Sequence, residues 1–133
     1  MSANVEIARR GFLALERGGV DAAAKFWHPE ISWRAIEGAP DDVGGMHGIE
    51  AARRYVEDWF DTFDDFTAEP VELIDAGEDQ VVAVLQIMGR AKLSGVETDL
   101  TYAALYTIRD GKIARGREYW TKEQALEAAG LSE

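Results

Sequence analysis

The sequence predicts an α+β fold in which helices lie on the concave side of a strongly bent, mainly antiparallel sheet. Two observations lead to this prediction. The first half of the chain contains two segments in which apolar residues recur at helical spacing, with a short third helical segment between them. The second half contains long segments with strand patterns, separated by short turns, at residues 66–74, 81–93, 98–108 and 113–120. A helix across the concave side of such a sheet would enclose a cavity.

The first helix is predicted to end at the pair Gly18 and Gly19. Its apolar face consists of Val5, Ala8, Phe12 and Leu15. Asp21 can cap a second, short helix over residues 22–27. That helix should end near His28, because the residue before a proline is disfavoured in the α conformation.

A short strand is predicted at residues 31–36, followed by a loop at residues 37–46 that is rich in glycine, proline and aspartate. A long third helix follows the loop. Its apolar face consists of Ile49, Ala52, Val56, Trp59, Phe60 and Phe63. This face needs a sheet to cover it.

The last two strands are joined by Asp110-Gly111, a strong hairpin signal because both residues of the tightest turns need positive φ. After them, Thr121 and Gln124 form a capping box for a final helix over residues 122–129. Gly130 follows its end. The expected order is therefore three helices with one strand among them, four long strands and a short helix.

The composition fits one globular domain over residues 1–133. A net charge of −11 would repel phosphate backbones and anionic lipids, so we expect neither nucleic acid nor a membrane as partner. The chain has no cysteine, and its two histidines, His28 and His47, are far apart, so we expect no metal site and no cofactor. The first residues lack the apolar core of a signal peptide, and a cytoplasmic location is expected.

The last strand carries an acid on its small, apolar face. A period of two puts Glu118 on the same face as Ala114, Gly116 and Trp120. Among aromatic side chains a carboxylate would lose hydration, and its pKa should rise towards values useful for acid/base catalysis. The alternative is a structural ion pair with Arg34, Arg90 or a neighbouring subunit.

Six aromatic residues are candidates to line a pocket for a flat, apolar ligand: Trp33, Tyr55, Trp59, Tyr102, Tyr106 and Trp120. Aromatic residues at periodic positions are also typical of a plain core. Tyr102, Ala104, Tyr106 and Ile108 share a face, and the small Ala104 leaves room between the tyrosines. His47 is a further candidate ligand-binding residue, since it adjoins the glycine-rich loop.

Several segments resemble the nuclear transport factor 2-like superfamily, in particular its SnoaL-like branch, which includes ketosteroid isomerases and limonene epoxide hydrolases. These segments are "FWHPEISW", "HGIEAARRYV", "ELIDAGEDQVV", "YTIRDGKI" and "REYWTKEQALEAAGL". The resemblance implies a cone-shaped, cystatin-like α+β roll with a pocket between helices and strands. It also implies a homodimer through the outer sheet face, where Arg115, Arg117 and Tyr119 would meet the second subunit.

The resemblance also implies where catalytic residues would lie. The ketosteroid isomerase base falls at Ala35 and its oxyanion donors at Phe12 and Ala104, so a classical ketosteroid isomerase site is not expected. The arginine and second aspartate of limonene epoxide hydrolases fall at Leu85 and Ile87. Glu118 matches an acid of those hydrolases. It also matches the acid/base carboxylate of SnoaL-type polyketide cyclases, with glutamate in place of aspartate.

The leading hypothesis is therefore a cofactor-independent isomerase, cyclase or hydrolase in which Glu118 moves a proton on an apolar cyclic substrate. One alternative is a binding module for an apolar small molecule without chemistry. Another is a dimerisation scaffold whose cone is filled by its own side chains.

Overall fold

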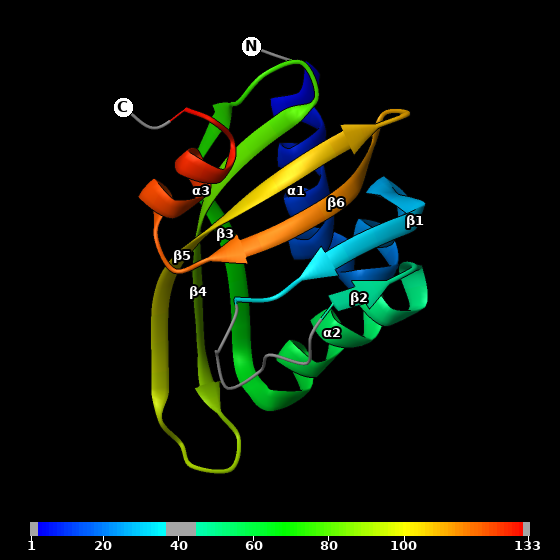
Figure 1. The fold of residues 1–133 in the computed structure, drawn as a ribbon. Coiled ribbons are helices and arrows are strands. Elements are labelled where there is room, and N and C mark those ends of the chain that lie inside the picture. Colours follow the sequence, from blue (N-terminus) through cyan, green and yellow to red (C-terminus); the bar gives the residue numbers. More distant parts are fainter. Residues whose placement is uncertain (1–2, 37–44, 132–133) are drawn as a thin grey trace.

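The computed structural model describes residues 3–36 and 45–131. Most of the expected loop, residues 37–44, lies outside the described part. The chain forms a six-stranded sheet, in which the strands lie in the order β2 (Gly45–His47), β1 (Trp27–Arg34), β6 (Lys112–Tyr119), β5 (Glu97–Arg109), β4 (Gln80–Ala91) and β3 (Phe63–Asp75). Every neighbouring pair is antiparallel except β1 and β6. The sheet curves around two helices, α1 (Ala3–Ala23) and α2 (Ile49–Thr62) (Figure 1). The expected α+β architecture is confirmed.

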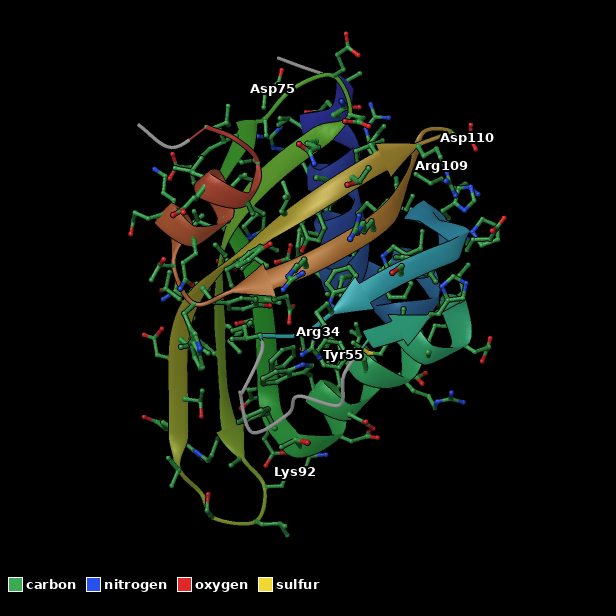
Figure 2. The ribbon with its side chains drawn as sticks, viewed as in Figure 1. Arg34, Tyr55, Asp75, Lys92, Arg109 and Asp110 are labelled. Carbon is green, nitrogen blue, oxygen red and sulfur yellow. The ribbon has the colours of Figure 1, made fainter. Side chains whose placement is uncertain are left out.

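The four long strands of the second half form a continuous antiparallel meander: β3 (Phe63–Asp75), β4 (Gln80–Ala91), β5 (Glu97–Arg109) and β6 (Lys112–Tyr119). Asp110 and Gly111 make the turn between β5 and β6 with φ angles of 55° and 73°, as the hairpin signal predicts. Figure 2 shows this turn at the tip of the hairpin, beside Arg109.

Helix α1 (Ala3–Ala23) includes the predicted break, because Gly19 has a φ of 74° that no helical residue adopts. A 3-10 turn, η1 (Ala24–Phe26), follows. The prediction of a second α-helix over residues 22–27 is therefore wrong for residues 24–27, which form this turn and the start of a strand. β1 (Trp27–Arg34) already begins at Trp27, so His28 lies in a strand. Pro29 is tolerated there because the pairing of β1 with β6 is irregular between Trp27 and Ser32.

Helix α2 (Ile49–Thr62) follows a three-residue strand, β2 (Gly45–His47), which the sequence does not predict. The helix ends one residue before the predicted Phe63, which opens β3 instead. Arg53 of α2 hydrogen-bonds to Asp21 near the end of α1, so the two helices are tied together at this point.

The two faces of the sheet pack differently. On the concave face, Val81, Ala83, Ala104 and Tyr106 join a core with residues of α1, α2 and β1. On the opposite face, the alternate residues, among them Val82 and Ala103, pack against helix α3 (Lys122–Ala128). The capping box of Thr121 and Gln124 starts α3, as predicted.

The register of β6 changes near its start. The pairing with β5 shifts between Thr107 and Ile108, so that Ile108 opposes Ile113 and Thr107 opposes Arg115. This bulge leaves Ala114 out of the regular pairing and puts Ile113 on the concave side with Glu118. A strict period of two predicts Ala114 on that side, and the bulge makes this prediction wrong. The assignments of Gly116 and Glu118 are unaffected because they lie beyond the bulge.

Within the described residues, no helix is both long and apolar enough to span a bilayer.

Candidate functional site

Two adjacent cavities with shared lining residues lie between the helices and the concave face of the sheet. The inner cavity has a volume of about 80 Å³ and lies between α1, α2 and the strands. The outer cavity has a volume of about 710 Å³ and opens beside α2. The same residues of α2, β4, β5 and β6 line both cavities and form the boundary between them: Tyr55, Trp59, Ile87, Tyr102 and Glu118.

Glu118 is placed at this boundary by the strand alternation of β6. Two residues earlier, Gly116 pairs with Trp33 of the neighbouring β1. A Cβ atom on Gly116 would lie 2.6 Å from the Trp33 ring, so only glycine allows the indole to lie flat against β6. The Trp33 ring in turn lines the inner cavity beside Glu118. Gly116 therefore makes room for the Trp33 side chain, which forms part of the lining of the inner cavity.

The Glu118 side chain is buried, with a residue exposure of 6%. Tyr55 of α2 donates a hydrogen bond to its Oε1 atom at 2.8 Å. Tyr102 of β5 donates to Oε2 at 3.3 Å. Figure 2 shows Tyr55 on the side of α2 that faces the sheet. Burial opposes ionisation of this carboxyl group, whereas the two phenol donors favour it and fix its orientation.

Two tyrosines near Glu118 are held in the neutral form. Burial raises the pKa of Tyr102 well above its usual range, and the negative charge of Glu118 raises it further. The same two causes, in the same order, raise the pKa of Tyr106. Both phenols therefore remain proton donors for hydrogen bonds at any physiological pH.

The structure brings most of the aromatic candidates together. Trp33, Tyr55, Trp59, Tyr102 and Tyr106 line the inner cavity, and Trp120 lines the outer cavity although it is 46% exposed. His47 is exposed in β2 and is not among the described lining residues, whereas its neighbour Met46 lines the outer cavity. Arg90, considered as a partner for Glu118, pairs with Glu97 instead.

Sequence reasoning did not identify the rest of the lining. Most of the remaining inner wall is aliphatic or phenylalanine, and its members could have been suggested only by their place on predicted apolar faces: Phe12, Leu15, Val56, Phe66, Leu85 and Ile87. The outer wall adds the charged residues Arg54 and Asp58, which are exposed on α2. Their positions in the sequence, on the polar side of a predicted helix, did not indicate that they line a cavity.

The positions at which the resemblance to ketosteroid isomerases and limonene epoxide hydrolases implies catalytic partners carry no acid, base or polar donor. Phe12, Leu85 and Ile87 line the inner cavity, and Ala35 and Ala104 are buried in the core. Glu118 is thus the one carboxylate among the described residues of the inner cavity. The arrangement can accept and return a proton at a single carboxyl group, in apolar surroundings, beside phenol donors.

Across the described ranges, no group of three histidine, cysteine or acidic side chains lies close enough to hold a metal ion. In the same part of the chain, the Trp33 indole nitrogen is the one fully enclosed side-chain nitrogen or oxygen without a hydrogen-bond partner. Such groups are uncommon in native proteins.

Comparison with protein families matches residues 8–116 to the model of the SnoaL-like domain. A comparison with curated proteins gives no match.

Solved structures show the same fold at low sequence identity. An NTF2-like protein from Burkholderia thailandensis superposes with a TM-score of 0.79 at 22% identity, over 98% of each chain. TerC, co-crystallised with polyporic acid, has a TM-score of 0.76 at 20% identity, over 97% of this chain and 99% of its own. A Mycobacterium tuberculosis protein in complex with estradiol-17β-hemisuccinate has a TM-score of 0.76 at 14% identity, over 91% of this chain and 95% of its own.

Proposed function

Because the chain belongs to the SnoaL-like domain family, we propose that it is a cofactor-independent enzyme that transfers a proton on an apolar cyclic substrate, as an isomerase, cyclase or hydrolase. Glu118 is the proposed acid/base residue. The observation that carries the proposal is the position of this buried carboxyl group at the boundary of two cavities, hydrogen-bonded by Tyr55 and Tyr102.

In the proposed reaction, the Glu118 carboxylate removes a proton from a carbon or oxygen of the bound substrate. The resulting carboxylic acid then returns the proton to another atom. Tyr55 and Tyr102 hold the carboxyl group in one orientation before the substrate binds. This preorganisation lowers the entropy cost of the reaction. A positioned acid/base group of this kind contributes about 10²–10⁴-fold to a rate.

The proposed substrate is cyclic and apolar because aromatic and aliphatic side chains dominate both linings. Two of the structural neighbours were crystallised with small cyclic compounds, polyporic acid and estradiol-17β-hemisuccinate. Those ligands support the proposal that the substrate contains a ring system. They do not identify the substrate.

The test is proton exchange on a bicyclic ketone. In D₂O, the wild-type chain should speed deuterium uptake by 2-tetralone, measured by mass spectrometry. Glu118→Gln should lower the enzyme-dependent rate at least about 100-fold, while a thermal-shift assay shows the same ligand stabilisation. Glu69→Gln, at an exposed position on β3, is the matched control and should keep the full rate. Full exchange activity in Glu118→Gln would contradict the proposal.

The second candidate function is a binding module for the same class of ligand. It is favoured by the apolar residues at the positions that match catalytic partners in relatives, among them Phe12, Leu85 and Ile87. A wild-type chain that binds 2-tetralone without any exchange would support this alternative. The third candidate is a dimerisation scaffold with a filled cone, and the free volumes of the two cavities favour the first two candidates over it.

We also propose that the chain is a homodimer that pairs through the outer sheet face, with Arg115, Arg117 and Tyr119 of β6 at the interface. Arg115 and Arg117 are exposed on this face, and the Arg117 guanidinium lies 5.7 Å from the centre of the Tyr119 ring. Light scattering after size exclusion should give twice the chain mass, and Arg115→Glu should reduce it. A monomeric wild-type chain would rule this interface out.

A further inference from the structure

The hydroxyl group of Tyr106 faces the inner cavity without a partner. Tyr106 is 2% exposed and lines this cavity. Tyr55 and Tyr102 donate hydrogen bonds to Glu118, whereas the Tyr106 hydroxyl has no hydrogen-bond partner among the described residues. Of the described side chains, only Trp33 has an unpartnered nitrogen or oxygen that is fully enclosed. The Tyr106 oxygen is therefore not fully enclosed and borders the free space of the cavity.

We propose that the Tyr106 hydroxyl is a binding subsite for a neutral acceptor oxygen on the ligand, such as a ketone or aldehyde oxygen. This inference rests on the proposed function and specifies its substrate class: the end of the substrate that enters the inner cavity carries the acceptor. A buried hydroxyl normally has a hydrogen-bond partner, and here the cavity is the place from which a partner can come.

The Tyr106 ring is held in place on both sides. Phe12 of α1 lies 6.1 Å from it and Trp33 of β1 lies 5.5 Å from it, measured between ring centres, and both pairs are tilted. The ring belongs to the regular part of β5, where Tyr106 pairs with Val81 and Gly116. The position of the hydroxyl oxygen is thus set before a ligand binds, which lowers the entropy cost of the hydrogen bond.

Charge selects a neutral acceptor over an anionic one. The negative charge of Glu118 acts on Tyr106 strongly enough to be one of the two causes that raise its pKa. An anionic ligand group at the same hydroxyl would experience the same charge as repulsion, in a cavity with little polar surface to screen it. The Tyr106 phenol stays protonated, so it can donate to a carbonyl oxygen throughout the physiological pH range.

Size limits what enters the inner cavity. Its volume of about 80 Å³ is smaller than the roughly 150 Å³ cavity that accommodates benzene in an engineered protein. A ring system therefore fits in the outer cavity of about 710 Å³, and only a small end group reaches past Glu118. The expected ligand is a ring system that carries a short carbonyl-containing end.

The test compares three probes with the same ring system: 2-acetylnaphthalene, 2-ethylnaphthalene and 2-naphthoate. Quenching of tryptophan fluorescence measures binding. The wild-type chain should prefer the ketone to the hydrocarbon by about threefold to tenfold, the value of one net hydrogen bond, and should bind the carboxylate most weakly. Tyr106→Phe should lower the ketone preference to about one without weakening the hydrocarbon. Thr101→Val, which removes a hydroxyl group from an exposed position of the same strand, is the control and should keep the preference.

A second measurement uses the wild-type chain alone. The infrared carbonyl stretch of bound 2-acetylnaphthalene should lie at lower wavenumber than in an apolar solvent, because a donated hydrogen bond weakens the carbonyl bond, and Tyr106→Phe should reverse this shift. An unshifted carbonyl in the wild type, an unchanged ketone preference in Tyr106→Phe, or equal weakening of both neutral probes would each overturn the subsite. Failure of every probe to bind would overturn the apolar ring site itself, whereas the exchange test of Glu118→Gln stands or falls separately.

Discussion

The concave and convex faces of the sheet pack against different elements and leave different amounts of free space. On β5 the concave face carries Tyr102, Ala104 and Tyr106, and the two cavities lie beside these tyrosines, between the sheet and the helices. On the convex face Ala103 is fully buried in the cluster that includes Ala125 of α3. Two small side chains at this contact let α3 pack closely on the sheet. The alternation of one strand thus gives a close helix contact on one side and cavities on the other.

The largest expected effect comes from adding volume to each face in turn. Ala103→Leu should destabilise the fold by about 3 kcal/mol, because Ala103 and Ala125 are both fully buried between the sheet and α3. Ala68→Leu, which adds the same volume beside the inner cavity, should leave stability nearly unchanged. Urea denaturation of the two variants measures the difference. Equal losses of stability would show that the concave face is as closed as the convex one.

A smaller loss of stability is expected at Gly116, which leaves room for the Trp33 ring. Gly116→Ala should cost about 2 kcal/mol, because the added methyl group would lie 2.6 Å from the Trp33 ring. In a double-mutant cycle, Trp33→Leu should recover most of that cost, since the smaller side chain can give way. Additive losses in the cycle would mean that the Trp33 ring is not the reason for glycine at this position.

The smallest expected change in stability occurs at alkaline pH and comes from Tyr106 on the concave face. The pKa of Tyr106 is raised in the folded chain, so above pH 10 the unfolded chain releases a proton that the folded chain retains, and stability falls as the pH rises. At pH 11 this can cost at most about 1.4 kcal/mol for one tyrosine, the limit for a folded tyrosine that keeps its proton. Tyr106→Phe should lose correspondingly less stability than the wild type between pH 9 and pH 11 in urea titrations. Parallel pH profiles would contradict a raised pKa.

Local signals in the sequence predicted much of the fold. The hairpin at Asp110-Gly111 and the capping box at Thr121 follow from the conformational needs of a few neighbouring residues, and both are present. The alternation in β6 also placed Glu118 on the concave side correctly. These features depend on interactions within one or two turns of the chain, which the sequence displays directly.

Features that depend on distant pairing were not predictable in the same way. β2 has only three residues and is defined by its pairing with β1. The start of β1 at Trp27 depends on its parallel partner β6, which lies more than 80 residues later. The bulge that puts Ile113 instead of Ala114 on the concave side depends on how β6 pairs with β5.

The site shows the same limit. Periodicity identified the aromatic candidates and Glu118 but could not show that they meet at the boundary of two cavities. It also could not distinguish the roles of the tyrosines. Tyr55 and Tyr102 donate to Glu118, whereas the Tyr106 hydroxyl is left for the cavity. That distinction arises from three-dimensional distances between α2, β5 and β6.

The proposed site binds a ring-shaped ligand across the two cavities, with the carbonyl end of the ligand against Glu118 and Tyr106. A crystal structure of the chain with 2-acetylnaphthalene would show this arrangement. We expect the naphthalene ring in the outer cavity and the ketone oxygen within hydrogen-bond distance of the Tyr106 hydroxyl, with the methyl carbon beside the Glu118 carboxyl group. A ligand bound outside the concave face, or with its ring in the inner cavity and its ketone in solvent, would contradict the proposed site.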